Sequence, residues 1–158
     1  MLQVKYANRT VLNEQAIRFL VRKFFKTRRN VSISFDLRIK DYGSYTYDSK
    51  TMTHKILISP TLNQICPVTD EMYSKQYSER KLISTLLHEI RHAQQREKYG
   101  LVYFKSSEFA INENMPNAAS AIYNAPREKD ARRYEKRKIK KALKLYSQFC
   151  KKVKKCQQ

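Results

Sequence analysis

The chain has 158 residues, of which 41% are hydrophobic, so it can bury one core and form a single domain over residues 1–158. Lys and Arg number 33 against 14 Asp and Glu; the net charge of +19 predicts a polyanionic partner, DNA or RNA first and an anionic membrane surface second. No segment has the ~18 apolar residues of a membrane span or the apolar core of a secretory signal, and three cysteines do not make a disulfide framework. We therefore expect a cytoplasmic protein that is not secreted, or, for a viral protein, one in the host cytoplasm or the virion.

The first predicted elements are a helix and three strands. Apolar residues recur at three- and four-residue spacing over 11–26, which predicts an amphipathic helix. Apolar and polar residues alternate over 31–40, and two further extended segments follow at 43–48 and 53–59, separated by turn residues. Such short connections predict an antiparallel sheet of three strands.

Two long helices are predicted in the second half of the chain. Residues 61–77 show no regular pattern and are expected to be irregular. A broad apolar face predicts a helix over about 79–98, with Gly100 as its stop. An apolar stripe in a very basic sequence predicts a second helix over about 127–155, as an extension of the same domain.

The segment LLHEIRHAQQ, inside the first of these long helices, contains the motif HExxH. His88 and His92 are four residues apart, so they share one helix face and can bind one Zn²⁺ at about 2.0–2.1 Å. Glu89 lies beside the pair and is expected to take a proton from a zinc-bound water, whose pKa zinc lowers towards ~7. The chain has only three histidines and two are in this motif, so the pattern predicts a zinc site with Glu89 as general base.

A catalytic zinc ion has three protein ligands and an open position for water, so a third ligand is needed. His54 is on the third predicted strand, where an exposed strand residue is the simpler interpretation. Glu128, at the start of the basic helix, is the expected ligand, because the small side chain of Ala131 lets this helix pack closely on the HExxH helix. Asp130 is the alternative ligand, or an acceptor for the N–H of a ligand imidazole. In a competing interpretation, Glu128 and Asp130 bind no metal and lie at the start of the helix only because the helix dipole favours acidic residues there.

A hydrolytic zinc site also needs a group that stabilises a tetrahedral oxyanion. Tyr123, five residues before Glu128, is the candidate chosen for this catalytic role. Arg91 and Tyr134 are the other candidates, and each of the three residue types is more often a packing or surface residue.

These motifs together resemble the small gluzincin-like metallopeptidases. GSYTYDSKTMTHKILISPTL followed by LISTLLHEIRHAQQ is similar to the core of SprT-like proteins, in which a strand pair with a glycine turn precedes the HExxH helix. Glu128-Lys129-Asp130-Ala131 resembles the ExxA motif of the ImmA/IrrE-like group, whose glutamate binds zinc. SprT-like proteins use a downstream histidine instead, and this chain has none after His92.

The resemblance covers about 31–135 and implies a minimal zincin-like domain, peptide-bond hydrolysis and work near DNA. The expected fold class is therefore α+β. It would combine an N-terminal helix, a small antiparallel three-stranded sheet, the HExxH active-site helix and the long basic C-terminal helix.

The basic C-terminal helix has three competing interpretations. It can track a phosphate backbone, lie on an anionic membrane surface, or be a solvated helix whose apolar stripe packs on the domain. Any nucleic-acid contact should be nonspecific, because no base-reading motif is visible. The cations assigned to that contact are Arg132, Arg133, Lys136, Arg137, Lys140, Lys141 and Lys144.

Two functions follow from the sequence. The first is a zinc-dependent metallopeptidase that hydrolyses a protein or peptide substrate near nucleic acid. The second is a non-enzymatic, basic nucleic-acid-binding protein, in one version a packaged viral protein, on a zincin-like scaffold. A buried metal with four protein ligands would favour the second function, and an open water position would favour the first.

Overall fold

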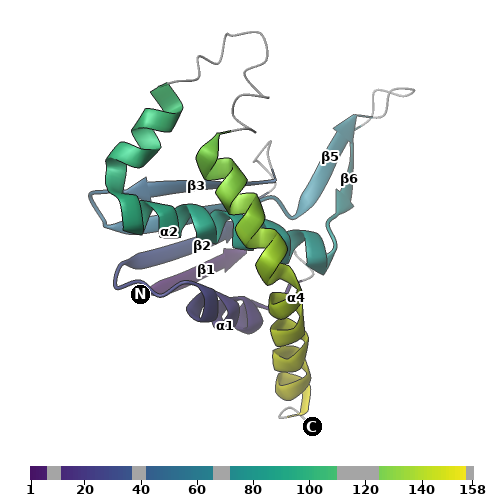
Figure 1. The fold of residues 1–158 in the computed structure, drawn as a ribbon. Coiled ribbons are helices and arrows are strands. Elements are labelled where there is room, and N and C mark those ends of the chain that lie inside the picture. The colour runs from purple at the N-terminus through teal and green to yellow at the C-terminus, as the bar shows by residue number, and fades with distance from the viewer. Residues whose placement is uncertain (7–11, 37–41, 66–71, 110–124, 156–158) are drawn as a thin grey trace.

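The computed structural model describes residues 1–6, 12–36, 42–65, 72–109 and 125–155 (Figure 1). The described chain is α+β, as the sequence predicts, with strands in a larger and a smaller sheet. The strands are β1 (Leu2–Tyr6), β2 (Asn30–Phe35), β3 (Gly43–Asp48), β4 (Thr53–Ile58), β5 (Thr61–Ile65) and β6 (Met72–Gln76). The helices are α1 (Glu14–Phe24), α2 (Glu79–Phe109) and α4 (Pro126–Lys155).

The main sheet is mixed, so the predicted antiparallel three-stranded sheet is wrong. Its order is β1-β2-β4-β3, in which β1, β2 and β4 run parallel and only β3 is antiparallel to β4. Helix α1 joins β1 to β2 as a crossover, the connection that parallel neighbours require. Strand β1 was not predicted, because Leu2 and Val4 are too few apolar residues for a recognisable alternation. Strand β4 lies between β2 and β3, so only the β3–β4 hairpin has the expected pairing.

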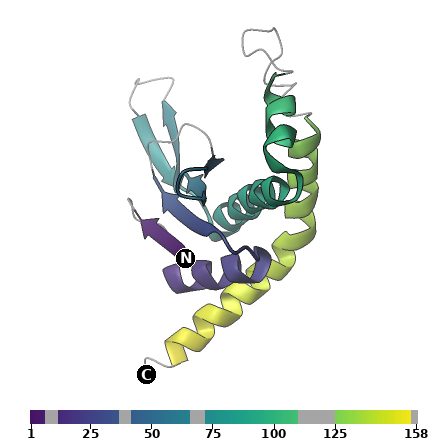
Figure 2. The same ribbon diagram turned by 90° about the vertical axis from the view of Figure 1, so that its left-hand side faces the viewer.

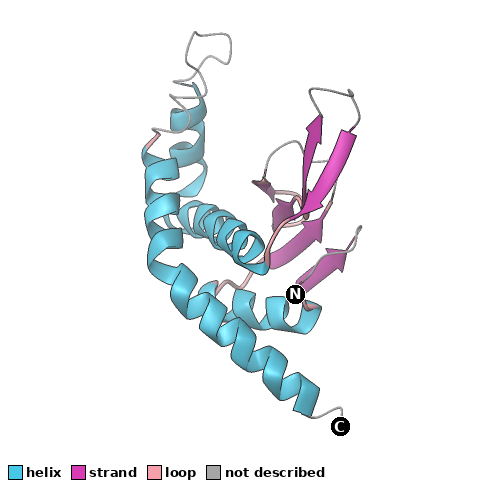
Figure 3. Ribbon diagram, turned by 90° about the vertical axis from the view of Figure 1, so that its right-hand side faces the viewer, coloured by secondary structure: helices cyan, strands magenta, loops and turns pink. Residues whose placement is uncertain are grey.

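The core lies between one face of the sheet and helices α1 and α2. Alternate side chains of β2 and β4 are buried on this face, and the parallel register pairs Ile33 with Ile56 and Phe35 with Ile58. Helix α1 has its N-cap at Asn13, whose side chain accepts from the backbone N–H of Ala16. Helix α4 crosses α1 and α2 as an outer layer, away from the sheet (Figures 2 and 3).

The two long helices differ in detail from their predicted extents. The backbone of α2 leaves helical geometry at Gly100 (φ 71°), where the sequence predicts a stop, but the helix resumes and runs to Phe109. Helix α4 covers the predicted basic segment, and Pro126 occupies a helix start, where a missing N–H costs nothing. Strands β5 and β6 form a separate antiparallel ribbon, so the irregular structure expected for 61–77 is wrong at 61–65 and 72–76, and 66–71 lie outside the described residues. Within the described ranges, no helix is long and apolar enough to cross a membrane.

Candidate metal centre

The candidate metal ligands come from two helices that pack against each other. His88 and His92 lie one turn apart on α2, and Glu128 lies in the first turn of α4. Ala131, one turn after Glu128, is 0% exposed, so its small side chain lies within the packed interface. The crossing of the two helices brings together groups that are 40 residues apart in the sequence.

The three side chains converge on one point. The Nε2 atoms of His88 and His92 are 3.1 Å apart, and the two Glu128 carboxylate oxygens lie 3.1 Å and 3.2 Å from them. One ligand atom from each residue falls within 4.8 Å of the others, so the set could hold a metal ion. Tetrahedral bonds of 2.0–2.2 Å put ligand atoms about 3.3 Å apart, which the observed spacing matches closely.

Without a metal, the cluster holds a proton between its basic and acidic members. Burial alone would lower the pKa of His88, but hydrogen bonds to Glu128 and Glu135 outweigh it and raise that pKa to about 9. Burial would likewise raise the pKa of Glu128, but hydrogen bonds from His88 and His92 hold it well below its usual range. The imidazolium–carboxylate pair thus supplies the charge balance that a bound cation would otherwise supply.

The remaining nitrogen of each imidazole has its own acceptor. Nδ1 of His92 lies 2.9 Å from Oε1 of Gln95, whose Nε2 donates to the Arg127 carbonyl at 3.0 Å and to Asp130 at 2.8 Å. Since the amide oxygen only accepts, Nδ1 of His92 must be a donor, so a neutral His92 would present the lone pair of its Nε2 to a metal in place of the hydrogen bond to Glu128.

Glu135 takes the equivalent position beside the other histidine. Its Oε2 lies 3.5 Å from Nδ1 of His88, and its Oε1 accepts a hydrogen bond from the Ser84 hydroxyl. The sequence analysis missed Glu135 and Gln95. The available signals were spacings, since Gln95 is three residues after His92 and Glu135 is seven after Glu128, each on the same helix face.

Asp130 lies near the cluster without joining it. Its Oδ2 accepts from Nε of Arg91 at 2.7 Å and from Gln95, so it reaches His92 only through Gln95. The predicted direct contact between Asp130 and a ligand imidazole is not made.

The oxyanion candidates lie elsewhere or outside the described chain. Arg91 pairs with Asp130 and donates to Gln94, and the Tyr134 hydroxyl lies 3.5 Å from the Phe24 carbonyl. Both side chains therefore belong to helix packing in this structure. Tyr123 falls within residues that the structure does not describe.

Glu89 lies against the first residue of β3. Its side chain is 5% exposed, and a Cβ built on Gly43 would lie 3.0 Å from Oε1 of Glu89 and 2.6 Å from Cγ2 of Thr85. Only glycine allows this approach of backbone to carboxylate. Gly43 is a site residue that the sequence analysis missed, because one glycine opening a strand gives no sign of what it faces.

His54 belongs to a different cluster, and the expectation of an exposed strand residue is wrong. It is 0% exposed, because its strand β4 is internal to the sheet and its side chain faces the helices. Its Nδ1 lies 2.9 Å from the Tyr45 hydroxyl and its Nε2 lies 2.9 Å from Oε1 of Glu97. Both ring nitrogens are therefore engaged within the protein.

The predicted nucleic-acid cations all lie on α4. Arg132 is half-buried, while the other six side chains of that set are exposed. Beyond Glu135 the sequence contains no acidic residue, so about the last five and a half turns of the helix carry positive charge alone.

No family model matches the chain, and no curated protein or solved structure matches it either.

Proposed function

We propose that the chain is a zinc-dependent metallopeptidase with a minimal zincin-like fold. His88, His92 and Glu128 would bind Zn²⁺, and Glu89 would act as general base. The observation that supports this proposal is the convergence of two imidazole nitrogens and one carboxylate beside a second, buried carboxylate. Two histidines and one glutamate form a set that zinc prefers, and three ligands leave a fourth position for water.

The chain's own residues divide the chemistry between them. Bound zinc would polarise the scissile carbonyl and lower the pKa of a water molecule. Glu89 would accept a proton from that water and pass it to the leaving amine. Gln95 and Glu135 would hold the two imidazoles in the orientation and tautomer that metal binding needs.

The position of β3 supports a peptide as the substrate. Among the described strands, β3 is the last one on its side of the main sheet, so its outer backbone groups can pair with an extended peptide. Because Gly43 opens this strand beside Glu89, a peptide paired with the edge would pass close to the general base.

The test is zinc content and casein cleavage by the wild type and by Glu89→Gln, with Glu97→Gln as the matched control on the same helix. Glu89→Gln should keep its zinc and lose about 10²- to 10⁴-fold in rate, the range for a general base. Glu97→Gln should cleave at the wild-type rate. Equal rates for Glu89→Gln and the wild type would reject this role of Glu89.

A second candidate function is non-enzymatic binding of nucleic acid by α4. Its apolar stripe is buried against the domain at Ile139, Ala142 and Tyr146, so this stripe is not free to enter a bilayer. The exposed cations on the outer face remain available for a phosphate backbone. This arrangement favours DNA or RNA over the membrane surface that the sequence left open.

Salt dependence tests the second function. Affinity for a labelled DNA duplex should fall with a log–log slope of about −0.9 for each phosphate neutralised. Replacing Lys136, Lys140 and Lys144 by Gln should make that slope less steep by the contribution of about three phosphate contacts. The control variant replaces Lys5, Lys50 and Lys55, which are also exposed but lie on strands or their turn. An affinity for DNA that does not change with salt concentration would rule out this function.

A further inference from the structure

Tyrosine rings and cations meet at both ends of β3. Tyr42 directly precedes the strand, and Nζ of Lys81 lies 3.6 Å from the centroid of its ring. Tyr47 lies near the other end, and Cζ of Arg96 lies 4.8 Å from the centroid of its ring. Both cations come from α2, seven residues before and eight residues after His88. A peptide paired with the outer edge of β3 would therefore run between two cations.

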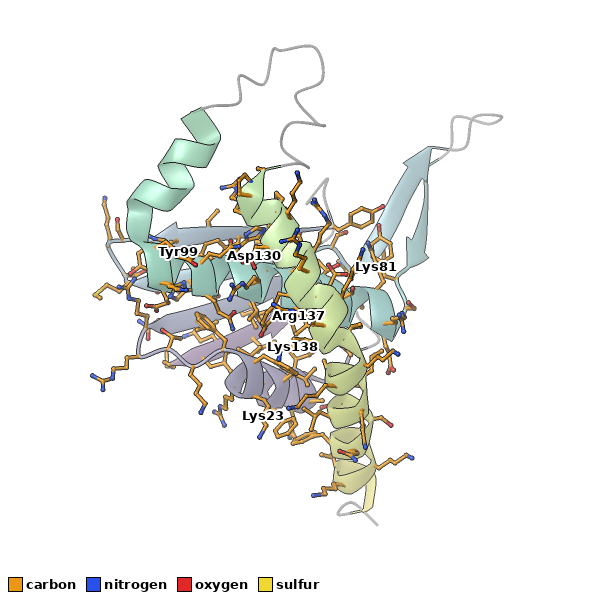
Figure 4. The ribbon with its side chains drawn as sticks, viewed as in Figure 1. Lys23, Lys81, Tyr99, Asp130, Arg137 and Lys138 are labelled. Carbon is orange, nitrogen blue, oxygen red and sulfur yellow. The ribbon has the colours of Figure 1, made fainter. Side chains whose placement is uncertain are left out.

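Tyr42 and Lys81, the pair at the beginning of β3, lie close to Glu89, the candidate general base. Tyr42 adjoins Gly43, the residue whose backbone meets Glu89. The Tyr77 ring lies 5.6 Å from the Tyr42 ring, and we call Tyr42, Tyr77 and Lys81 the Lys81 platform. Figure 4 shows Lys81 near the beginning of α2, where the β5–β6 ribbon ends.

The Lys81 platform has free surface and unbalanced charge. Tyr42 is 51% exposed, so much of its ring remains open to a ligand. Among the described side chains, no carboxylate lies within ion-pair distance of Lys81, although its charge reaches Glu135 and helps to lower the pKa of that carboxyl, which burial would raise. An ammonium group resting on a ring keeps hydrogen-bond donors for an acceptor on its outer side.

We infer that the Lys81 platform binds an acidic side chain of a peptide paired with the β3 edge, so that the substrate class is acidic extended peptides. This inference rests on the proposed peptidase function. Two turns of α2 separate Lys81 from His88, about 10.5 Å along the axis. That length matches about three residues of an extended strand. The acidic residue should therefore lie about three residues from the scissile bond.

Charge decides between an acidic and an aromatic occupant of the platform. A tyrosine ring alone would accept an aromatic side chain as readily. The ammonium of Lys81 and the net charge of +19 both attract a carboxylate and repel a basic peptide. The aromatic occupant is therefore kept as an outcome of the test.

The experiment compares three extended peptides that differ only three residues from the central bond, where they carry Glu, Gln or Phe. Cleavage by the zinc-loaded wild type gives kcat/KM, and binding to zinc-loaded Glu89→Gln gives affinity without turnover. Both are repeated with Lys81→Met. The matched control is Lys98→Met, since Lys98 lies on the same helix, is exposed and has its Nζ 4.9 Å from the Tyr99 ring centroid.

We expect the Glu peptide to be preferred by about fivefold, the upper range for a partly exposed ion pair. Lys81→Met should abolish the preference and Lys98→Met should keep it. A preference for Phe, no preference, or a Glu preference that survives Lys81→Met would each overturn the inference. If no peptide is cleaved but Glu89→Gln binds the Glu peptide through Lys81, the peptidase proposal fails while the acidic-peptide site stands.

Discussion

Helix α2 takes part in two histidine–carboxylate clusters that differ in what the ring nitrogens do. In the candidate metal centre, Nε2 of His88 and Nε2 of His92 point at the same carboxylate, and each Nδ1 has a separate acceptor. In the second cluster, His54 uses one nitrogen for Tyr45 and the other for Glu97. Proximity of histidine and carboxylate is common to both, so the feature that suits only the first cluster to a metal ion is the convergence of two ring nitrogens and a carboxylate on one point.

The second cluster instead ties together separate parts of the fold. Glu97 accepts from the Thr27 hydroxyl at 2.6 Å and lies 3.6 Å from Nε of Arg29, both in the connection between α1 and β2. His54 and Tyr45 add β4 and β3 to the same network. With every polar atom of the His54 ring satisfied, this cluster is suited to stability and not to ligand binding.

The largest expected effect comes from removing a ring nitrogen from each cluster. His92→Ala should lower zinc affinity by more than the roughly 10- to 100-fold that losing an outer hydrogen-bond partner costs. His54→Asn should keep zinc affinity unchanged and lower the free energy of unfolding, since it leaves buried partners unsatisfied. Competition with a chromophoric chelator measures the affinity. Zinc binding that depends on His54 and not on His92 would reverse the assignment.

A second test uses the chain's two glycines, because Gly43 lies against Glu89 whereas Gly100 has open space around it. In Gly43→Ala the new methyl would displace Glu89, and a misplacement near 1 Å can cost about 10²-fold in rate. In Gly100→Ala the new methyl meets nothing within 4 Å, but the backbone at φ 71° and ψ −165° is essentially restricted to glycine, so the change should cost about 1–3 kcal/mol of stability.

Peptide cleavage and thermal unfolding of both variants separate these effects. The Gly43 variant should lose activity while its zinc is kept, and the Gly100 variant should lose stability alone. Full activity in Gly43→Ala would show that the β3 backbone does not limit the position of Glu89.

The features that the sequence predicted best are those contained within a single helix. The α+β class and the positions of the long helices follow from apolar periodicity, and the HExxH spacing places both histidines on one face whatever surrounds them. Glu128 could be selected because it opens the next helix beside a small residue. Its role as a ligand stays a prediction, although the structure brings it to both imidazoles.

What the sequence could not predict depends on how separate elements cross. The order of the sheet depends on α1 crossing between β1 and β2, and β1 has too few apolar residues to reveal this. His54 appeared to be an exposed strand residue because neither its neighbours in the sheet nor α2 is visible in its local pattern. Gln95 and Glu135 carried spacing signals, but their orientation towards the imidazoles depends on the α2–α4 crossing.

A smaller effect should come from the acceptors around each cluster. Glu135→Ala should lower zinc affinity about tenfold, the lower end for loss of an outer partner, because His88 loses the carboxylate beside its Nδ1. Glu97→Ala removes the equivalent acceptor from His54 and should leave zinc affinity unchanged. The same chelator competition measures both variants. Similar losses in both variants would mean that general destabilisation, and not contact with His88, weakens zinc binding.

The smallest effect should be a dependence of stability on pH through His54. Burial lowers the pKa of His54 below its ordinary value of 6.5, although the hydrogen bond to Glu97 opposes this. As the pH falls through 6.5, His54 therefore takes up a proton in the unfolded chain but not in the folded chain. The free energy of unfolding should decrease from pH 6.5 down to the folded-state pKa.

Denaturant unfolding of the zinc-free protein measures this slope, with His54→Asn as the control. His88, whose folded-state pKa of about 9 lies above its ordinary value of 6.5, adds a slope of the opposite sign, which is the same in both proteins and cancels when they are compared. The control should therefore flatten the pH dependence in this window even if its overall stability is lower. Equal slopes in the two proteins would assign the acid sensitivity to carboxylates and would show that protonation of His54 is not linked to folding.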